Sequence, residues 1–235
     1  MTDQVHAIGV GGGPAGLMAA EVLAMGGATV HLYDGMPSVG RKFLLAGKGG
    51  LNLTHAEDLE TFIGRYGPRA PEVGALLRRF TPQQLRNWAA GLGIHSFVGS
   101  SGRVFPQHMK AAPLLRAWLH RLREQGVRFH MRHRWLGWDE SGALAFGTPA
   151  GKCTFAADAT LLALGGGSWA KLGSDGRWVP MLQEHGIDIA ALRPANCGFD
   201  IGAAESDGEG WSEHFRSRFS GEPLKAIAVN FSDAS

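Results

Sequence analysis

Three glycines near the start of the sequence have a spacing that suits phosphate binding. Gly11, Gly13 and Gly16 follow the pattern Gly-x-Gly-x-x-Gly. In this pattern the first glycine allows a tight turn, the second lets a pyrophosphate approach the backbone, and the third lets a helix pack closely on a strand. The N–H groups at the start of the following helix, together with its dipole, attract an anion without a cationic side chain. We therefore predict a phosphate-binding turn over residues 11–16.

The residues around this turn predict a strand, a helix and a second strand. Residues 5–10 form a short apolar run typical of a buried strand, and Pro14 suits the first turn of a helix that continues through residues 17–25. A second apolar run, residues 29–33, ends at Asp34. In a βαβ unit, an acidic residue about 20 residues after the glycines binds the ribose of a dinucleotide. Asp34 is therefore a candidate ribose ligand.

A glycine-rich segment with three cations follows this unit. Residues 35–55 contain Arg41, Lys42 and Lys48 among many glycines. Such a composition suits a loop that wraps an anionic ligand better than it suits a core. We predict a ligand-binding loop here, and a mobile surface loop is the alternative interpretation.

Apolar periodicity and turn residues predict an α/β fold for the rest of the chain. Residues 81–84 have the Thr-Pro-Gln-Gln sequence of a capped helix start. The expected elements are helices within 57–93, short strands at 94–98 and 103–105, an amphipathic helix at 111–125, a three-stranded antiparallel meander over 127–155, a buried parallel strand at 159–164, a helix at 179–185 and a strand at 226–231.

The composition is that of an ordinary globular protein and excludes several classes. The chain has 235 residues, is 44% hydrophobic and 19% charged, and has a formal net charge of +2, which gives no electrostatic reason to expect a nucleic-acid partner. The first residues do not resemble a signal peptide and no stretch is long enough to span a bilayer, so we expect a cytoplasmic protein with no membrane partner. Cys153 and Cys197 are too far apart for a Cys-x-x-Cys redox pair or a zinc knuckle, and we expect no metal site.

The motifs in the sequence resemble a known family. They are the glycine turn, the segment Gly-Arg-Lys-Phe-Leu-Leu-Ala-Gly-Lys-Gly-Gly-Leu-Asn-Leu-Thr at residues 40–54, Gly-Arg-Val-Phe-Pro at 102–106 with Lys110, and Leu-Gly-Gly-Gly-Ser at 164–168 with Gly-Ser at 173–174. Together they resemble the two-dinucleotide-binding-domain flavoproteins and, within these, the bacterial aminoacetone oxidase-type or BaiN-like FAD-binding family. The resemblance extends through about residue 187.

The chain departs from the family pattern in two respects. Leu51 stands where the family usually has a cysteine or a similar small residue. Family members also continue through an inserted domain and then return to the FAD fold, and no such return is visible here. The resemblance therefore implies a Rossmann-like FAD-binding domain at residues 1–192, the incomplete start of an inserted domain at 193–235, and a chain that is truncated at its C-terminus.

The resemblance also implies which residues hold FAD. The pyrophosphate would lie at the glycine turn, and Asp34 would bind the adenosine ribose. Lys48, Lys110 and His108 are the candidates for proton or anion handling, while the resemblance identifies no catalytic residue. The complete set of expected cofactor-binding residues is Gly11, Gly13, Pro14, Ala15, Gly16, Asp34, Arg41, Lys42, Gly47, Asn52, Gly165 and Gly166.

The function expected from these features is that of an FAD-dependent oxidoreductase acting on a small molecule, with NAD(P)H as one candidate reductant. In such enzymes the hydride chemistry belongs to the flavin, and the protein binds and orients it. Two alternatives remain at this point. One is an NAD-dependent dehydrogenase, which the meander over residues 127–155 and the loop at residues 40–41 argue against. The other is an FAD-binding remnant without turnover, and the sequence names neither the substrate nor the electron donor.

Overall fold

The computed structural model describes residues 5–193 and 212–220. One compact unit extends over Met1–Leu192, and a second begins at Arg193 and contains helix α8 (Glu213–Phe219). The strand expected at residues 226–231 lies outside the described residues. The assignment of residues 193–235 to an inserted domain stays a prediction.

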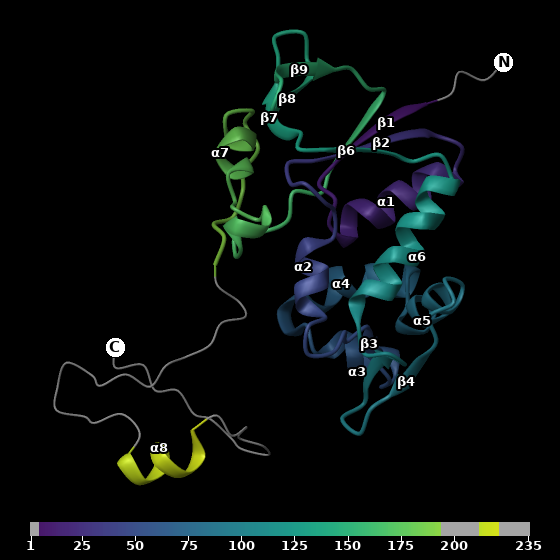
Figure 1. Ribbon diagram of the computed structural model, residues 1–235, viewed down its shortest axis with the longest axis vertical. Coiled ribbons are helices and arrows are strands. Elements are labelled where there is room, and N and C mark those ends of the chain that lie inside the picture. Colours follow the sequence, from purple (N-terminus) through teal and green to yellow (C-terminus); the bar gives the residue numbers. More distant parts are fainter. Residues whose placement is uncertain (1–4, 194–211, 221–235) are drawn as a thin grey trace. The chain divides into compact units, whose positions relative to one another are not determined.

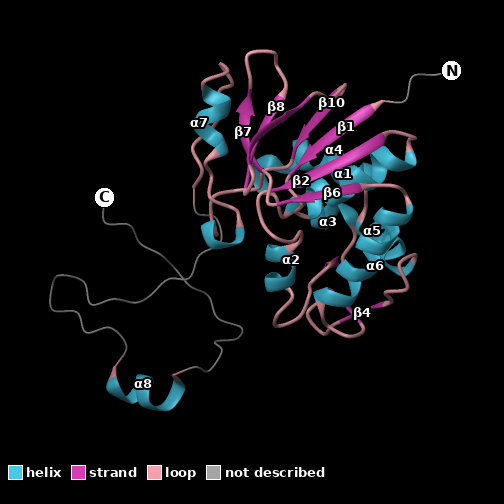
Figure 2. Ribbon diagram, turned by 45° about the horizontal axis from the view of Figure 1, so that its top comes forward, coloured by secondary structure: helices cyan, strands magenta, loops and turns pink. Residues whose placement is uncertain are grey.

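A parallel sheet of four strands forms the centre of the first unit (Figures 1 and 2). Its strands are β1 (His6–Val10), β2 (Thr29–Asp34), β6 (Arg128–Met131) and β10 (Ala159–Leu162), in the order β10-β1-β2-β6. Helix α1 (Pro14–Met25) connects β1 to β2. The sheet therefore brings the carboxyl ends of β1, β2 and β10 to the same edge, where α/β proteins bind their ligands.

The two faces of the sheet bury different cores because successive side chains of a strand point to opposite faces. On one face, Val30 and Leu32 of β2 pack with α1 and with α6 (Ala111–Glu124). On the other face, Tyr33 packs with the aromatic residues of a second, antiparallel sheet. The result is three layers, with helices, the parallel sheet and the antiparallel sheet stacked in that order.

The antiparallel sheet is the expected meander, although it begins later than expected. Its strands are β7 (Arg134–Trp138), β8 (Leu144–Thr148) and β9 (Gly151–Phe155), and α7 (Trp178–Gln183) packs beside it. Residues 128–131, which we expected within the meander, form β6 and pair in parallel with β2. The apolar pattern of a short strand does not show whether it pairs in parallel or antiparallel, so this assignment could not be made from the sequence.

Strand β10 is parallel to β1, as expected, but it is not buried. It lies at one edge of the sheet formed by the described residues, and Ala159 and Thr160 are exposed. The continuous apolar run 159–164 predicts burial on both faces, and the described part of the chain does not provide it.

A smaller set of elements lies beside and below α6 in the view of Figure 1. The capping box at Thr81 is confirmed, since Thr81 and Gln84 exchange side-chain and backbone hydrogen bonds of 2.7 and 3.2 Å. The prediction of a loop at residues 35–55 is wrong in part, because this segment contains helix α2 and strand β3.

The smaller set of elements consists of α2 (Arg41–Ala46), β3 (Thr54–His55), α3 (Leu59–Gly64), η1 (Gly67–Arg69), α4 (Ala70–Arg79), α5 (Pro82–Ala90), β4 (Ser96–Val98) and β5 (Arg103–Pro106). A further short helix, η2 (Ala170–Leu172), follows β10.

None of the helices in residues 5–193 or 212–220 is both long and apolar enough to cross a membrane. The same residues contain no group of three or more His, Cys, Asp or Glu side chains that could hold a metal ion.

Candidate functional site

The three glycines of the turn between β1 and α1 have three different environments. Gly11 has φ +107°, and a Cβ atom there would overlap the carbonyl oxygen of Ala163. A Cβ atom on Gly16 would overlap the carbonyl oxygen of Gly11, so α1 could not pack this closely on the turn. The Cβ position of Gly13, by contrast, has no atom within 4 Å. The geometry therefore matches a tight turn, a close helix contact and, at Gly13, an open approach to the backbone.

Helix α1 presents an open N-terminus at this turn. Gly13 is its N-cap and Pro14 its first residue, and the first helical hydrogen bond runs from the N–H of Leu17 to the carbonyl of Gly13 at 2.9 Å. No side chain caps the first turn. Its free N–H groups, including that of Ala15, are therefore available to an anion.

The side chain of Asp34, at the end of β2, forms a hydrogen bond with the backbone of the glycine turn. Its Oδ2 accepts a 2.7 Å hydrogen bond from the N–H of Gly12, and its Oδ1 accepts a 2.7 Å hydrogen bond from the N–H of Met36. Burial raises the pKa of this carboxyl above its ordinary value, and the N–H groups of Met36 and Gly12 and the nearby Arg41 cation offset part of the rise. Because each carboxylate oxygen has a second lone pair, Asp34 can still accept a ribose hydroxyl. The structure thus gives Asp34 a structural role that the motif did not predict.

A cavity of about 410 Å³, here called the nucleotide cavity, opens beside this turn. Its walls come from the turn after β1, from the connection between β2 and α2 together with α2 itself, and from the loop after β10. It brings together seven of the expected cofactor residues, namely Gly11, Gly13, Pro14, Asp34, Arg41, Lys42 and Gly165. Other lining residues include Gly12, Met36, Ser38, Gly40, Phe43, Ala46, Ala163, Leu164, Leu172, Gly173 and Ser174.

The other five expected residues are not among those that line the nucleotide cavity. Gly166 is next to the lining residue Gly165, and its carbonyl accepts a hydrogen bond from Ser174. Ala15 and Gly16 continue α1 beyond the turn. Gly47 ends α2 and lies against Ala111 of α6. Asn52 is exposed on the connection to β3.

Two cations of α2 face the cavity in different ways. Lys42 directs its Nζ to Ser168 Oγ at 3.1 Å and to Ser174 Oγ at 3.3 Å. Ser174 Oγ in turn donates to the carbonyl of Gly166 at 2.8 Å, so this hydroxyl links α2 to the loop after β10. The Nε of Arg41 is buried and has no hydrogen-bond partner among the described residues. An unpaired buried donor of this kind indicates a ligand or solvent acceptor nearby.

Sequence reasoning missed the residues of a smaller cavity that adjoins Asp34. This cavity has a volume of about 100 Å³, and its walls include Met36, Arg134, Trp135 and Trp178. The indole Nε1 atoms of both tryptophans are buried without a hydrogen-bond partner in the described part of the chain. In the sequence these tryptophans look like ordinary core residues, so nothing marked them as part of a site.

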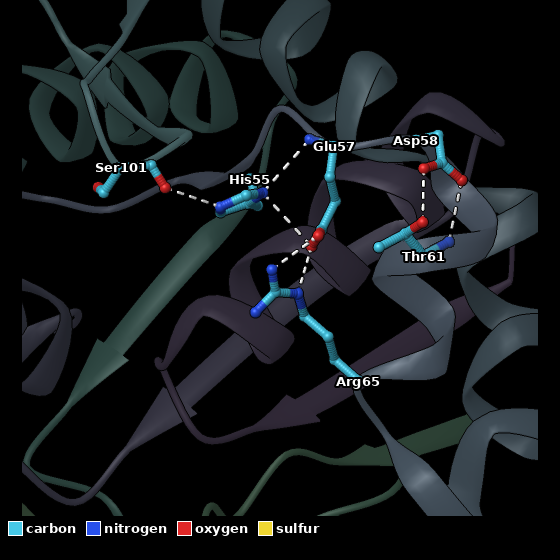
Figure 3. Close-up of polar contacts among 6 residues, drawn as sticks. All are labelled: His55, Glu57, Asp58, Thr61, Arg65 and Ser101. Atoms are coloured by element: carbon cyan, nitrogen blue, oxygen red, sulfur yellow. Dashed lines mark hydrogen bonds and ion pairs between the residues drawn. The ribbon is translucent and has the colours of Figure 1, made fainter. Parts of the chain in front are cut away.

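A separate polar cluster lies around β3 and the start of α3 (Figure 3). Arg65 donates to both carboxylate oxygens of Glu57, with Nη2 at 2.7 Å from Oε2, and this holds the pKa of Glu57 below its ordinary value. His55 contacts Glu57 through Nδ1 and the carbonyl of Ser101 through Nε2, at 3.3 and 3.0 Å. These contacts join β3 and α3 to the turn between β4 and β5, and we assign them a structural role.

Comparison with known proteins identifies the family. Residues 5–211 match the family model of the HI0933-like protein Rossmann domain. The 3-dehydro-bile acid delta(4,6)-reductase of Clostridium scindens is 30% identical over 189 residues, which are 79% of this chain and 45% of that protein. The chain thus spans less than half the length of this curated relative.

Solved structures share the fold at low sequence identity. The 3-ketosteroid-delta4-(5alpha)-dehydrogenase of Rhodococcus jostii RHA1, solved with 4-androstene-3,17-dione, is 17% identical with a TM-score of 0.60, over 80% of this chain and 56% of that one. An open conformation of a flavocytochrome c3 fumarate reductase is 22% identical with a TM-score of 0.54, over 70% of this chain and 34% of that one. The parallel sheet with its meander is therefore the fold that the sequence predicted. Because the family model covers most of the chain, the chain belongs to the HI0933-like family of Rossmann FAD domains, the BaiN and aminoacetone oxidase family that its motifs resemble.

Proposed function

We propose that this chain binds FAD in the nucleotide cavity and is the FAD-binding part of an oxidoreductase that acts on a small molecule. The observation that carries the proposal is the glycine turn itself. Gly11 and Gly16 leave no room for a side chain, while Gly13 faces open space beside an uncapped helix N-terminus. This combination accommodates a pyrophosphate at the turn.

The residues around the turn fit the rest of the cofactor's adenosine half. Asp34 keeps a free lone pair on each oxygen for the ribose hydroxyls. Arg41 and Lys42 place two positive charges at the cavity, and the Nε of Arg41 lacks an acceptor among the described residues. The adjoining smaller cavity offers the unpaired indole N–H groups of Trp135 and Trp178, which suit the acceptor nitrogens of an adenine.

When bound, FAD supplies the hydride and electron chemistry of this class of enzyme. The residues of this chain bind the phosphates, hold the ribose and fix the cavity wall, through the link from Lys42 to Ser174 and on to the Gly166 carbonyl. Lys48, Lys110 and His108 are not in the walls of the nucleotide cavity, and we assign them no proton-transfer step. NAD(P)H remains our candidate reductant, and a small-molecule substrate is proposed from the reductase relative.

A titration with FAD and with NAD, followed by flavin absorbance and tryptophan fluorescence, tests the proposal. Gly13→Val is the informative variant, because the N-cap backbone at φ −79° and ψ 178° accepts valine and no atom lies within 4 Å of its Cβ position. The variant should fold, yet its side chain fills the space through which the pyrophosphate approaches. Losing even one charge-assisted hydrogen bond to a phosphate, roughly 1.5–3 kcal/mol, weakens binding by about tenfold or more.

The control is Gly64→Val, at the exposed last residue of α3, whose Cβ position is also free of neighbours. This variant should bind FAD as the unchanged chain does. If Gly13→Val retains FAD, or if NAD binds more tightly than FAD, the proposal is wrong.

A further inference from the structure

Two histidines on neighbouring strands of the parallel sheet form a hydrogen bond with each other. His31 of β2 and His130 of β6 stack with their ring centroids 5.0 Å apart, and the Nε2 of His130 lies 3.1 Å from the Nδ1 of His31. His130 also stacks on Tyr33, which packs against the meander. Neither histidine lines the nucleotide cavity or the smaller cavity beside it. We call His31 and His130 the imidazole pair.

The hydrogen bond of the imidazole pair requires that one of the two facing nitrogens lacks a proton. A neutral imidazole has one N–H donor and one acceptor, whereas an imidazolium has two donors and no acceptor. The bond therefore survives the first added proton, which an outward-facing nitrogen can take up. A second proton places an N–H group on both facing nitrogens and a positive charge on both rings. The hydrogen bond is then lost, and the two rings repel each other.

The surroundings of the imidazole pair oppose its protonation. Burial lowers the pKa of both histidines, and the cation of Arg128 on β6 adds to the effect on each. His6 of β1 acts in the same direction on His31, and His133 acts so on His130. Arg128 takes part in none of the ion pairs that the described residues form. Two protonated rings would thus add to a group of positive charges.

The other titratable groups around the imidazole pair do not offset this charge. Burial raises the pKa of Tyr33 to about 12, and Cys153 of β9 adds to the rise, so the phenol stays neutral where histidine titrates. Asp158 accepts a hydrogen bond from the backbone N–H of His6 at 2.8 Å. Within residues 5–193 and 212–220, no carboxylate is among the groups that shift the pKa of either histidine.

The segment that follows β6 is hydrogen-bonded to the segment that follows β2. The N–H of His133 donates to the carbonyl of Asp34 at 2.9 Å, and the N–H of Arg132 donates to the carbonyl of Met36 at 3.1 Å. Arg132 has φ +60°, a left-handed conformation that residues other than glycine rarely adopt. These two hydrogen bonds therefore hold a strained backbone in place.

Asp34 connects the same segment to the glycine turn. Its carboxylate accepts hydrogen bonds from the N–H groups of Gly12 and Met36, each at 2.7 Å. If β6 separated from the end of β2, the backbone that carries Asp34 and Met36 would lose two of its supports. The position of Asp34 relative to the turn would then be less fixed, although neither ring of the imidazole pair lines the nucleotide cavity.

We propose that the imidazole pair is an acid-sensitive switch: when both histidines are protonated, β6 separates from the end of β2 and the affinity of the chain for FAD falls. The effect on FAD rests on the proposed function, whereas the opening of β6 is a property of the fold alone. Each proton that only the open state binds favours opening by up to about tenfold per pH unit. Two histidines therefore allow a change of up to about a hundredfold over one unit below their ordinary pKa.

Hydrogen exchange of individual amides, measured by NMR at pH 7.0 and pH 5.5 and corrected for the intrinsic exchange rates, reports the opening. Protection of the Arg132 and His133 amides should fall by about tenfold or more at the lower pH. The amide of Ala163, which donates to the carbonyl of Val10 at 2.8 Å, should keep its protection. Global unfolding would expose all three amides, so this comparison separates local opening from a general loss of stability.

His130→Gln is the informative variant, because a glutamine amide can donate to His31 but takes up no proton in this pH range. In this variant, protection of the Arg132 and His133 amides should change little between the two pH values. His31→Gln removes the same pair from the other strand and replaces His130→Gln should that variant not fold. The control is His95→Gln, at an exposed histidine, which should behave as the unchanged chain does.

FAD affinity is titrated at the same two pH values in each chain. It should fall by about tenfold or more at pH 5.5 in the unchanged chain, and less in His130→Gln. Protonation of Asp34, whose pKa burial raises, would weaken FAD binding equally in both chains, so the difference between the chains is the informative quantity.

Three results would overturn the inference: equal protection at both pH values, the same loss of protection in His130→Gln, or opening without a difference in FAD affinity between the two chains. A chain that opens at pH 5.5 but binds no FAD at pH 7.0 would contradict the proposed function and the link to the cofactor, and would support the opening of β6.

Discussion

Replacing Glu21 by alanine should destabilise the fold far more than replacing an exposed glutamate. Glu21 lies on α1 and is 4% exposed. Its Oε2 accepts hydrogen bonds from the indole N–H groups of Trp118 at 2.6 Å and Trp88 at 3.1 Å. Its Oε1 lies 3.1 Å from the Nε of Arg121. One carboxylate thus joins α1, which carries the phosphate-binding turn, to α5 and α6.

The expected magnitude follows from what the substitution leaves behind. Alanine would leave two indole N–H donors and the positive charge of Arg121 without their partner in the core between three helices. Removing one partner of a buried ion pair costs about 3–5 kcal/mol. Because the Arg121 side chain is 27% exposed, solvent compensates part of its charge, and we expect a loss of about 3 kcal/mol. That is a large share of the 5–15 kcal/mol that stabilises a typical domain.

Urea denaturation followed by circular dichroism measures the change, and fluorescence reports locally because two tryptophans contact the carboxylate. The control is Glu60→Ala, since Glu60 pairs with Arg78 at 2.8 Å while both side chains are more than half exposed. An exposed pair of this kind contributes about 0–1 kcal/mol. If Glu21→Ala loses no more stability than Glu60→Ala, the carboxylate does not hold the three helices together.

Three further outcomes are expected. Gly13→Val should fold and lose FAD, as the paired titration with Gly64→Val will show. Asp34→Ala should lower both FAD affinity and stability. The stability should fall by roughly 1.5–3 kcal/mol for each of the two charge-assisted hydrogen bonds from backbone N–H groups that are lost, and unchanged FAD affinity would leave Asp34 with a structural role alone. Burial lowers the pKa of His31 and of His130 below the ordinary 6.5, and the neighbouring Arg128 adds to the effect on each. As the pH falls, these histidines therefore take up protons in the unfolded chain before they do so in the folded chain. The stability that they contribute above pH 6.5 should accordingly fall as the pH drops below 6.5. Denaturation midpoints measured between pH 8 and pH 5 should show this loss, and His130→Gln should reduce it; a flat profile would contradict it.

The part of the site that depends on local backbone geometry could be predicted from the sequence. The positive φ of Gly11 and the close contact at Gly16 arise within a few residues of the turn or from the strand beside it. The spacing of glycines therefore carries the geometry directly. The same holds for the helix that begins after Thr81, whose cap and first turn are adjacent in sequence.

The part that depends on distant partners could not be predicted. Strand β6 has the pattern of a meander strand, and only its parallel pairing with β2 shows otherwise. Strand β2 lies about a hundred residues earlier in the chain. Glu21 looks like a surface residue of an otherwise apolar helix, and its burial follows from two tryptophans that lie 67 and 97 residues further on. The residues of α2 look like part of a loop in the sequence because the glycines on both sides outweigh their short apolar stretch, and the packing of α2 against α6 is long-range.

The wall of the nucleotide cavity formed by the loop after β10 depends on one cation of α2. Lys42 contacts the hydroxyls of Ser168 and Ser174, which are neutral, and takes part in none of the ion pairs of the described residues. Neutral hydroxyls position an ammonium group without cancelling its charge, so that charge stays available to a phosphate beside it. Ser174 also fixes the Gly166 carbonyl. The same side chains that shape the cavity therefore keep a positive charge at the place where we propose that the cofactor's phosphates lie.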